Sequence, residues 1–131
     1  MPYRFEFDAV HKVLMVVLEG KVPGWEVEKY HQQMPLQIER LNPAALICDY
    51  SAVTHLDISA GAIRELAHKD HTRPESLHRF IVAQTPHIFG LARMYTLYAD
   101  RSSEALQSVH TRAEALTALG LGDLQIQPVT L

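Results

Sequence analysis

Apolar and polar residues follow two different periods along the chain, and each change of period marks a new element. Over residues 3–8, aromatic side chains alternate with charged ones, which is typical of a strand with one buried face. A second run, residues 13–18, is rich in β-branched residues. The two segments therefore predict an antiparallel hairpin, and the breakers Val22, Pro23 and Gly24 end it.

The next segment has the spacing of an amphipathic helix. Between Trp25 and Leu41, apolar residues recur at intervals of three and four. Pro35 falls inside this pattern, so we expect a kink or an interruption near it. Asn42 and Pro43 mark the end of the helix.

The remaining sequence alternates short apolar runs with helical patterns. The run at residues 45–48 is typical of a strand covered on both faces, and the polar stretch from Asp49 to Ser51 is expected to end it. After it the pattern predicts a helix over 59–69, a loop over 70–76, a strand over 79–83, a helix over 88–99, a strand over 106–110 and a helix over 112–119. The tail from Leu124 has no assignment.

This order, ββαβαβαβα, indicates the fold class. Strands separated by single helices need crossover connections, which favour a parallel sheet covered by helices. We expect one α/β domain over residues 1–131, with a mainly parallel (mixed) sheet, an N-terminal antiparallel hairpin and helices packed on the sheet. A chain of 131 residues fits one domain with one core.

Charge and composition narrow the classes of partner. The net charge is −3 and no cluster of Lys and Arg is present, so we expect no nucleic-acid binding. No run reaches the roughly 18 apolar residues that span a bilayer, and the N-terminus lacks the apolar segment of a secretion signal. With a single cysteine, Cys48, in an apolar run, we expect a cytoplasmic protein.

Four polar residues surround the expected strand-to-helix turn, and they form the first candidate site: Asp49, Ser51, Asp57 and Ser59. Ser59 stands at the N-cap position of the following helix. A helix start has unpaired N–H groups and a partial positive charge, which favour an anion or a phosphoryl group. Ser59 is thus a helix cap, a phospho-acceptor or both, and spacing alone does not decide between them.

The hypotheses of a catalytic site and of a metal site have less support from the sequence. Ser59, His55 and Asp57 can be assembled into a triad, but no nucleophile elbow and no glycine-rich phosphate loop accompany them. His68 and His71 have a metal-ligand spacing without a third ligand. We expect no enzyme activity, no metal and no cofactor.

A second candidate site is apolar. Large side chains crowd residues 89–98, more than one buried helix face requires, so this helix is expected to pack in the core, to line a small pocket or to form a homodimer seam. The pocket or dimer candidates are Trp25, Phe89, Leu91, Met94, Tyr95 and Tyr98.

Three segments of the sequence carry a resemblance to a known family: the motif Asp49, Ser51, Val53, Asp57 and Ser59, and the stretches at residues 89–95 and 114–120. They resemble the STAS domain, the anti-sigma-factor antagonist fold, in its SpoIIAA-like branch. In partner-switching members of this family, a kinase phosphorylates a serine at the position of Ser59. The resemblance implies a non-enzymatic regulatory module that binds an unidentified protein and is switched at Ser59. The alternative is a carrier of a small apolar or lipid-like ligand, because some relatives are associated with such ligands.

Overall fold

The computed structural model describes residues 3–74, 76–102 and 104–129, without the side chains of His71 and Thr72. The strands β1 (Tyr3–Asp8) and β2 (Val13–Pro23) form the expected antiparallel hairpin. The helix α1 (Gly24–Leu41) follows it. The rest of the chain comprises β3 (Ala45–Asp57), α2 (Ala60–His68), the 3-10 turn η1 (Lys69–Thr72), β4 (His78–Val82), α3 (Pro86–Ala99), β5 (Leu106–Val109), α4 (Arg112–Ala118) and β6 (Gln127–Pro128).

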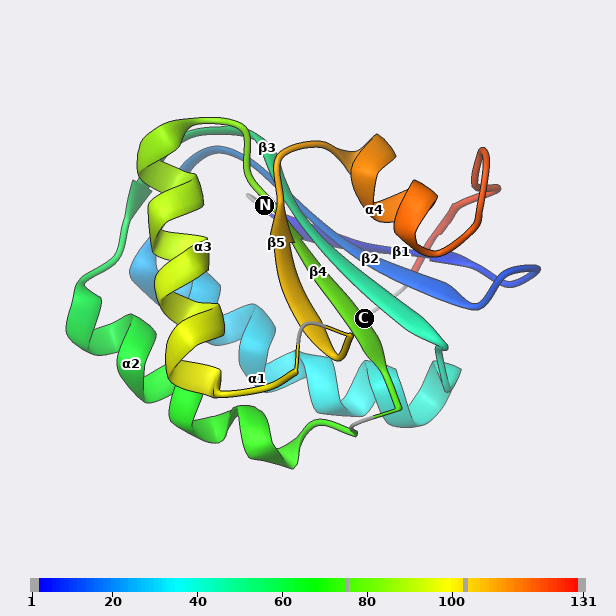
Figure 1. Ribbon diagram of the computed structural model, residues 1–131, viewed down its shortest axis with the longest axis horizontal. Helices are drawn as coiled ribbons and strands as arrows, with labels where there is room; N and C mark the ends of the chain where they lie inside the picture. Colours follow the sequence, from blue (N-terminus) through cyan, green and yellow to red (C-terminus); the bar gives the residue numbers. More distant parts are fainter. Residues whose placement is uncertain (1–2, 75, 103, 130–131) are drawn as a thin grey trace.

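All the strands belong to one mixed sheet with the order β5-β4-β3-β2-β1-β6 (Figure 1). The pairs β2–β3, β3–β4 and β4–β5 are parallel, whereas β1 pairs antiparallel with β2 and with β6. The parallel pairs follow from the helical crossovers, as the order of elements predicts. The structure confirms the expected α/β class, with its N-terminal hairpin and its mainly parallel sheet.

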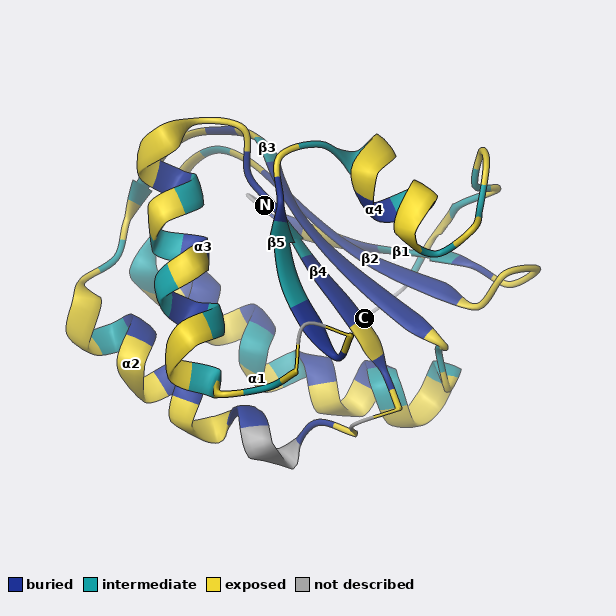
Figure 2. Cartoon of the chain, viewed as in Figure 1, coloured by how far each residue is buried: buried dark blue, intermediate teal, exposed yellow. Residues whose placement is uncertain are grey.

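The sheet buries both of its faces (Figure 2). Leu14, Val16 and Leu18 of β2 belong to the apolar core beneath α1, α2 and α3. Their neighbours Val13 and Met15 belong to the smaller core beneath α4 and the C-terminal tail. Consecutive strand residues point to opposite faces, so a strand in the middle of this sheet is apolar at nearly every position.

The strand β3 corrects the expectation that polar residues end it at Asp49. It continues for 13 residues to Asp57, and β2 lengthens beside it, so that Pro23 pairs with Asp57. Asp49 is tolerated inside the strand because its carboxylate accepts hydrogen bonds from the Ser51 amide at 2.9 Å and from Arg112 Nη2 at 2.7 Å. Because its oxygens accept hydrogen bonds, the carboxylate can be buried inside a strand, and the chain does not have to turn at Asp49.

The helix α1 continues through Pro35, so the expected interruption is absent. A proline in a helix removes the hydrogen bond to the carbonyl four residues earlier, which here belongs to His31. Arg73 Nη2 donates to that carbonyl oxygen at 3.2 Å and replaces the missing amide.

Two further expectations need correction. The segment 70–76 is not simply a loop, because its first residues complete η1 and the Asp70 side chain is buried. The tail that had no assignment contributes β6, which pairs with β1 and continues in a hydrogen bond from the Val129 amide to the Phe5 carbonyl at 2.9 Å.

Candidate functional site

The junction between β3 and α2 carries Ser59, which is exposed and is the N-cap residue of α2. Its Oγ accepts a hydrogen bond from the Ala62 amide at 3.1 Å. The junction packs against the start of α1, where a Cβ added to Gly24 would lie 3.1 Å from the Asp57 carbonyl oxygen and 3.5 Å from Ile58 Cγ1. Glycine at position 24 therefore lets α1 approach this junction closely.

The four polar residues expected at one turn separate into two pairs. Asp57 and Ser59 are at the junction, whereas Asp49 and Ser51 lie eight and six residues before Asp57 in the same extended strand. At about 3.3 Å per residue, Asp49 and Asp57 are roughly 25 Å apart. Asp49 instead binds Arg112, the first residue of α4, on the opposite face of the sheet from α1, α2 and α3.

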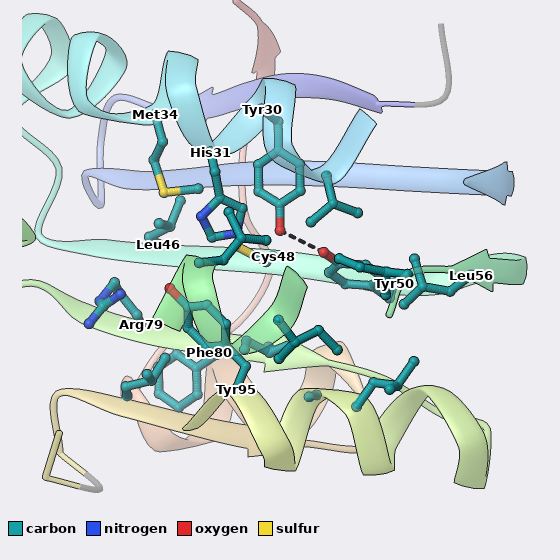
Figure 3. A pocket seen from close by; sticks show the side chains of 18 of the residues that line it. Tyr30, His31, Met34, Leu46, Cys48, Tyr50, Leu56, Arg79, Phe80 and Tyr95 are labelled. Atoms are coloured by element: carbon teal, nitrogen blue, oxygen red, sulfur yellow. Dashed lines mark hydrogen bonds between the residues drawn. The ribbon is translucent and has the colours of Figure 1, made fainter. Parts of the chain in front are cut away.

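A cavity of about 60 Å³ lies between the sheet and the helices α1, α2 and α3 (Figure 3). Most of its wall is apolar, including Met34 and Leu46. Tyr30 of α1 points toward Tyr50 of β3, and their hydroxyl oxygens are 2.6 Å apart in a buried hydrogen bond. Burial raises the pKa of Tyr30 above its usual value and that of the adjacent Cys48 thiol to about 12.

A buried ionic cluster adjoins one end of this cavity. Asp70 of η1 accepts hydrogen bonds from Arg79 Nη1 at 2.5 Å, from Arg79 Nη2 at 2.6 Å and from the Tyr95 hydroxyl at 2.6 Å. Arg101 Nε lies 3.2 Å from the same carboxylate. Burial by itself raises the pKa of Asp70, but the hydrogen bonds from Arg79 and Tyr95 outweigh it, so this pKa is below its ordinary value. The cluster therefore joins η1, β4, α3 and the segment after α3.

His31 of α1 separates the cavity from an outer groove. The groove, of about 360 Å³, lies between α1 and α2, and it shares His31, Leu66 and Arg73 with the cavity wall. Burial and, to a lesser extent, the nearby Arg73 cation lower the pKa of His31 to about 3, so the imidazole is neutral at physiological pH.

The apolar candidates are divided between the core and the surface. Leu91 and Tyr95 line the cavity. Phe89 stacks on His110 with ring centroids 4.0 Å apart, and Met94 is half-buried against the core. Trp25 is 61% exposed and the Tyr98 hydroxyl accepts a hydrogen bond from Arg64 at 3.2 Å, so neither reaches the cavity.

Sequence reasoning missed the polar side chains of the cavity. The sequence pattern places Tyr30 on a helix face and Tyr50 at the end of a strand. It places Asp70 in a loop and Arg79 in a strand, and it gives neither of them a partner. Only the fold brings them together.

Among the described residues, no group of three His, Cys, Asp or Glu side chains is placed to hold a metal ion. The side chain of His71 is outside the description.

His55 is on the exposed end of β3 and not in a turn with Ser59. Its Nδ1 is 3.1 Å from Thr54 Oγ1. Ser59 Oγ instead accepts a hydrogen bond from the Ala62 amide.

Within the described part of the chain, no helix combines the length and the apolar character needed to cross a bilayer.

The comparisons with known proteins bear on the fold. No family model matches this sequence, and no curated protein matches it. Among solved structures, the anti-sigma factor antagonist SpoIIAA in its unphosphorylated form superposes with a TM-score of 0.59 at 12% identity, over 90% of this chain and 97% of that one. The phosphorylated SpoIIAA of Bacillus, a cell-fate determinant, gives a TM-score of 0.51 at 15% identity, over 89% and 98%.

A third similar structure is an uncharacterised protein of the DUF3478 family from Shewanella loihica, described as having a SpoIIAA-like fold. It gives a TM-score of 0.50 at 17% identity, over 80% of this chain and 82% of that one. Identities this low carry the architecture and not the activity. On its topology and on these superpositions, the chain has the SpoIIAA-like fold of STAS domains.

Proposed function

We propose that this protein is a non-enzymatic regulatory module that binds a protein partner through the surface around Ser59, and that modification of Ser59 switches the binding. The observation that carries the proposal is the exposed Ser59 hydroxyl at the N-cap of α2. The similar fold of SpoIIAA, solved in unphosphorylated and phosphorylated forms, supports it.

The electrostatics of the junction make Ser59 suitable for a switch. A phosphoryl group there adds up to about two negative charges at the positive end of α2. Asp57, two residues earlier, is exposed and repels the same group. Attraction by the helix and repulsion by the carboxylate oppose each other, so a charge at Ser59 changes both the potential and the local conformation that a partner meets.

The cavity gives little support to a carrier of lipid-sized molecules. Pockets that enclose drug-sized ligands measure about 300–1,000 Å³. The volume of about 60 Å³ between the sheet and the helices is several times smaller. A lipid chain would have to displace a large part of the apolar core.

The proposal is tested by affinity capture from the source cells with four baits: the unmodified protein, Ser59→Ala, Ser59→Asp and Thr111→Ala. Thr111 is the matched control, because it caps α4 through the Glu114 amide and lies at a different helix start. We expect Ser59→Asp to change the recovery of at least one protein about tenfold or more, a difference of about 1.4 kcal/mol in binding. Direct titration of that protein should reproduce the change. Equal recoveries with all four baits would contradict the switch.

A further inference from the structure

We propose that the protein partner places an arginine or lysine side chain, next to an apolar one, in the outer groove between α1 and α2, and that a phosphoryl group on Ser59 strengthens this contact. The groove as a site for a basic side chain is independent of the proposed function, and only its assignment to the partner switched at Ser59 rests on it. Three features carry the inference: the exposed Trp25, two carboxylates on opposite sides of the groove, and the position of Ser59 at the same end.

The groove begins beside the β3–α2 junction. Both helices start at this end, because Gly24 at the start of α1 packs against Ile58, and they run in the same general direction (Figure 1). The volume of about 360 Å³ is within the usual range of ligand pockets, about 300–1,000 Å³. The walls of the groove are spaced at helical intervals and comprise Glu28, Gln32 and Pro35 of α1 and Ala62, Glu65 and Lys69, which follow Ser59 along the chain.

Trp25 stands at the Ser59 end of this groove. It is 61% exposed, and it precedes the groove residues Glu28 and Gln32 by three and seven positions, so the three residues share one side of α1. Tryptophan is enriched among the residues that dominate binding energy, because a large rigid ring is ordered at low entropic cost. Its ring face also attracts cations. A partner that covers Trp25 with an apolar side chain therefore brings its neighbouring side chain into the groove.

Glu28 and Glu65 line this end of the groove from opposite sides. Both are exposed, and neither has an ion-pair partner among the described residues. Two negative charges on either side of a groove favour a cation between them. A guanidinium group suits the place best, since its planar fork donates two parallel hydrogen bonds to a carboxylate.

The far end of the groove carries the opposite charge. Lys69 and Arg73 line it there, after the last turn of α2. Arg73 is held by the His31 carbonyl oxygen at 3.2 Å, and its charge still repels a second cation. The groove therefore has an acidic end beside Ser59 and a basic end away from it. A protein segment with one basic side chain fits this polarity better than a polycation does, and it binds with that side chain toward Ser59.

Ser59 is close enough to add to the acidic end. It precedes Glu65 by six residues, which correspond to about 9 Å along a helix axis. A phosphoryl group on Ser59 brings up to about two further negative charges. The separation is close to the Debye length of about 8 Å at physiological ionic strength, so the attraction of a basic side chain increases and is greatest at low salt. The sign of the switch follows: phosphorylation strengthens the contact.

The binding test uses the peptide acetyl-Leu-Arg-Leu-amide as the probe, at constant low ionic strength. Trp25 is the single tryptophan of the chain, so its fluorescence reports binding beside the groove. In the control peptide, neutral citrulline replaces arginine. We expect saturable binding of the arginine peptide, with a Kd about threefold or more lower when position 59 carries phosphoserine. No saturable binding, or an equal Kd for the citrulline peptide, would overturn the site. Equal Kd values with serine and phosphoserine would overturn the coupling.

Exposed substitutions locate the probe. Glu28→Gln and Glu65→Gln each remove one charge and keep the shape of the side chain, so each should raise the Kd about threefold or more. Glu39→Gln is the matched control, because Glu39 is exposed on α1 but outside the groove. Trp25→Ala, followed by calorimetry, should weaken binding about tenfold, whereas Leu36→Ala, at a side chain 62% exposed on the same helix, should not. Unchanged Kd values in folded Glu28→Gln and Glu65→Gln would overturn the proposal.

The captured partner distinguishes this inference from the proposed function. We expect Ser59→Asp to raise its recovery and Glu28→Gln to lower it, with Glu39→Gln unchanged. A partner whose recovery depends on Ser59 but not on Glu28 would overturn the use of the groove alone, and lower recovery with Ser59→Asp would overturn the sign of the switch. Binding of the arginine peptide that depends on Glu28, together with equal recoveries from all the Ser59 baits, would overturn the proposed function alone.

Discussion

At the scale of single residues, the side chain with the greatest structural consequence is Asp70. Its carboxylate is fully enclosed and accepts hydrogen bonds from Arg79 and Tyr95. A buried carboxylate is tolerated only when its oxygens are satisfied, because removing one partner leaves a desolvated charge. Asp70 thereby fixes η1 onto β4 and α3, and it holds the guanidinium of Arg79 at the end of the cavity.

This role predicts an asymmetry between two tyrosines of α3. Tyr95→Phe removes the hydroxyl that donates to Asp70 at 2.6 Å, and a hydrogen bond to a charged group contributes about 1.5–3 kcal/mol. Tyr98→Phe is the matched control, since its exposed hydroxyl accepts from Arg64 and surface changes cost about 0.5 kcal/mol or less. Urea unfolding should show a clear loss of unfolding free energy for Tyr95→Phe alone. Equal losses for both variants would contradict the role of Asp70.

At the scale of the element, the start of α2 combines a structural and a proposed regulatory role in one residue. Ser59 caps α2 as the sequence predicted, and Thr111 caps α4 in the same manner. The Thr111 cap is reinforced by Glu114, whose amide donates to Thr111 Oγ1 at 3.1 Å and whose carboxylate accepts from the same hydroxyl at 3.2 Å. Loss of either cap should weaken the helix that follows.

Substitution of Ser59 separates the two roles. Ser59→Ala should lower the unfolding free energy by about 1 kcal/mol, because the Ala62 amide loses its acceptor, whereas Ser59→Asp should keep most of it since aspartate also caps. Chemical denaturation of both variants, with Thr111→Ala beside them, measures this. If Ser59→Asp were as destabilised as Ser59→Ala, a change in partner binding by Ser59→Asp would reflect lost structure and not charge.

The order of the elements was predictable from periodicity, but their lengths depended on distant contacts. The strand β3 appeared to end at Asp49 because Arg112, which binds that carboxylate, is 63 residues away. Pro35 predicts a kink or an interruption of α1 because the donor to the His31 carbonyl, Arg73, lies 42 residues further along the chain. Local pattern located Ser59 as a cap, since a cap is made within four residues. Local pattern does not predict the cavity or the Asp70 cluster, because segments far apart in the sequence build each of them.

At the scale of the whole molecule, the helices α1, α2 and α3 cover one face of the sheet, and α4 with the tail covers the other (Figure 1). Many of the large apolar side chains of α3 pack against the core, including Phe89, Leu91 and Met94. Leu97 and Tyr98 are left exposed at its C-terminal end. If α3 forms a homodimer contact, these two exposed side chains, and not the buried ones, are expected to make it.

The homodimer prediction is therefore best tested at Leu97. This side chain is 70% exposed, so Leu97→Glu leaves the core intact and places a charge in any seam formed by the outer face of α3. Val10→Glu is the matched control, because Val10 is 71% exposed but lies between β1 and β2, away from α3. In light scattering over a concentration series, we expect a dimer for the unmodified protein and for Val10→Glu, and a monomer for Leu97→Glu. A monomeric unmodified protein at the highest concentration would rule out the dimer, and a dimer that survives Leu97→Glu would place the seam elsewhere than on α3.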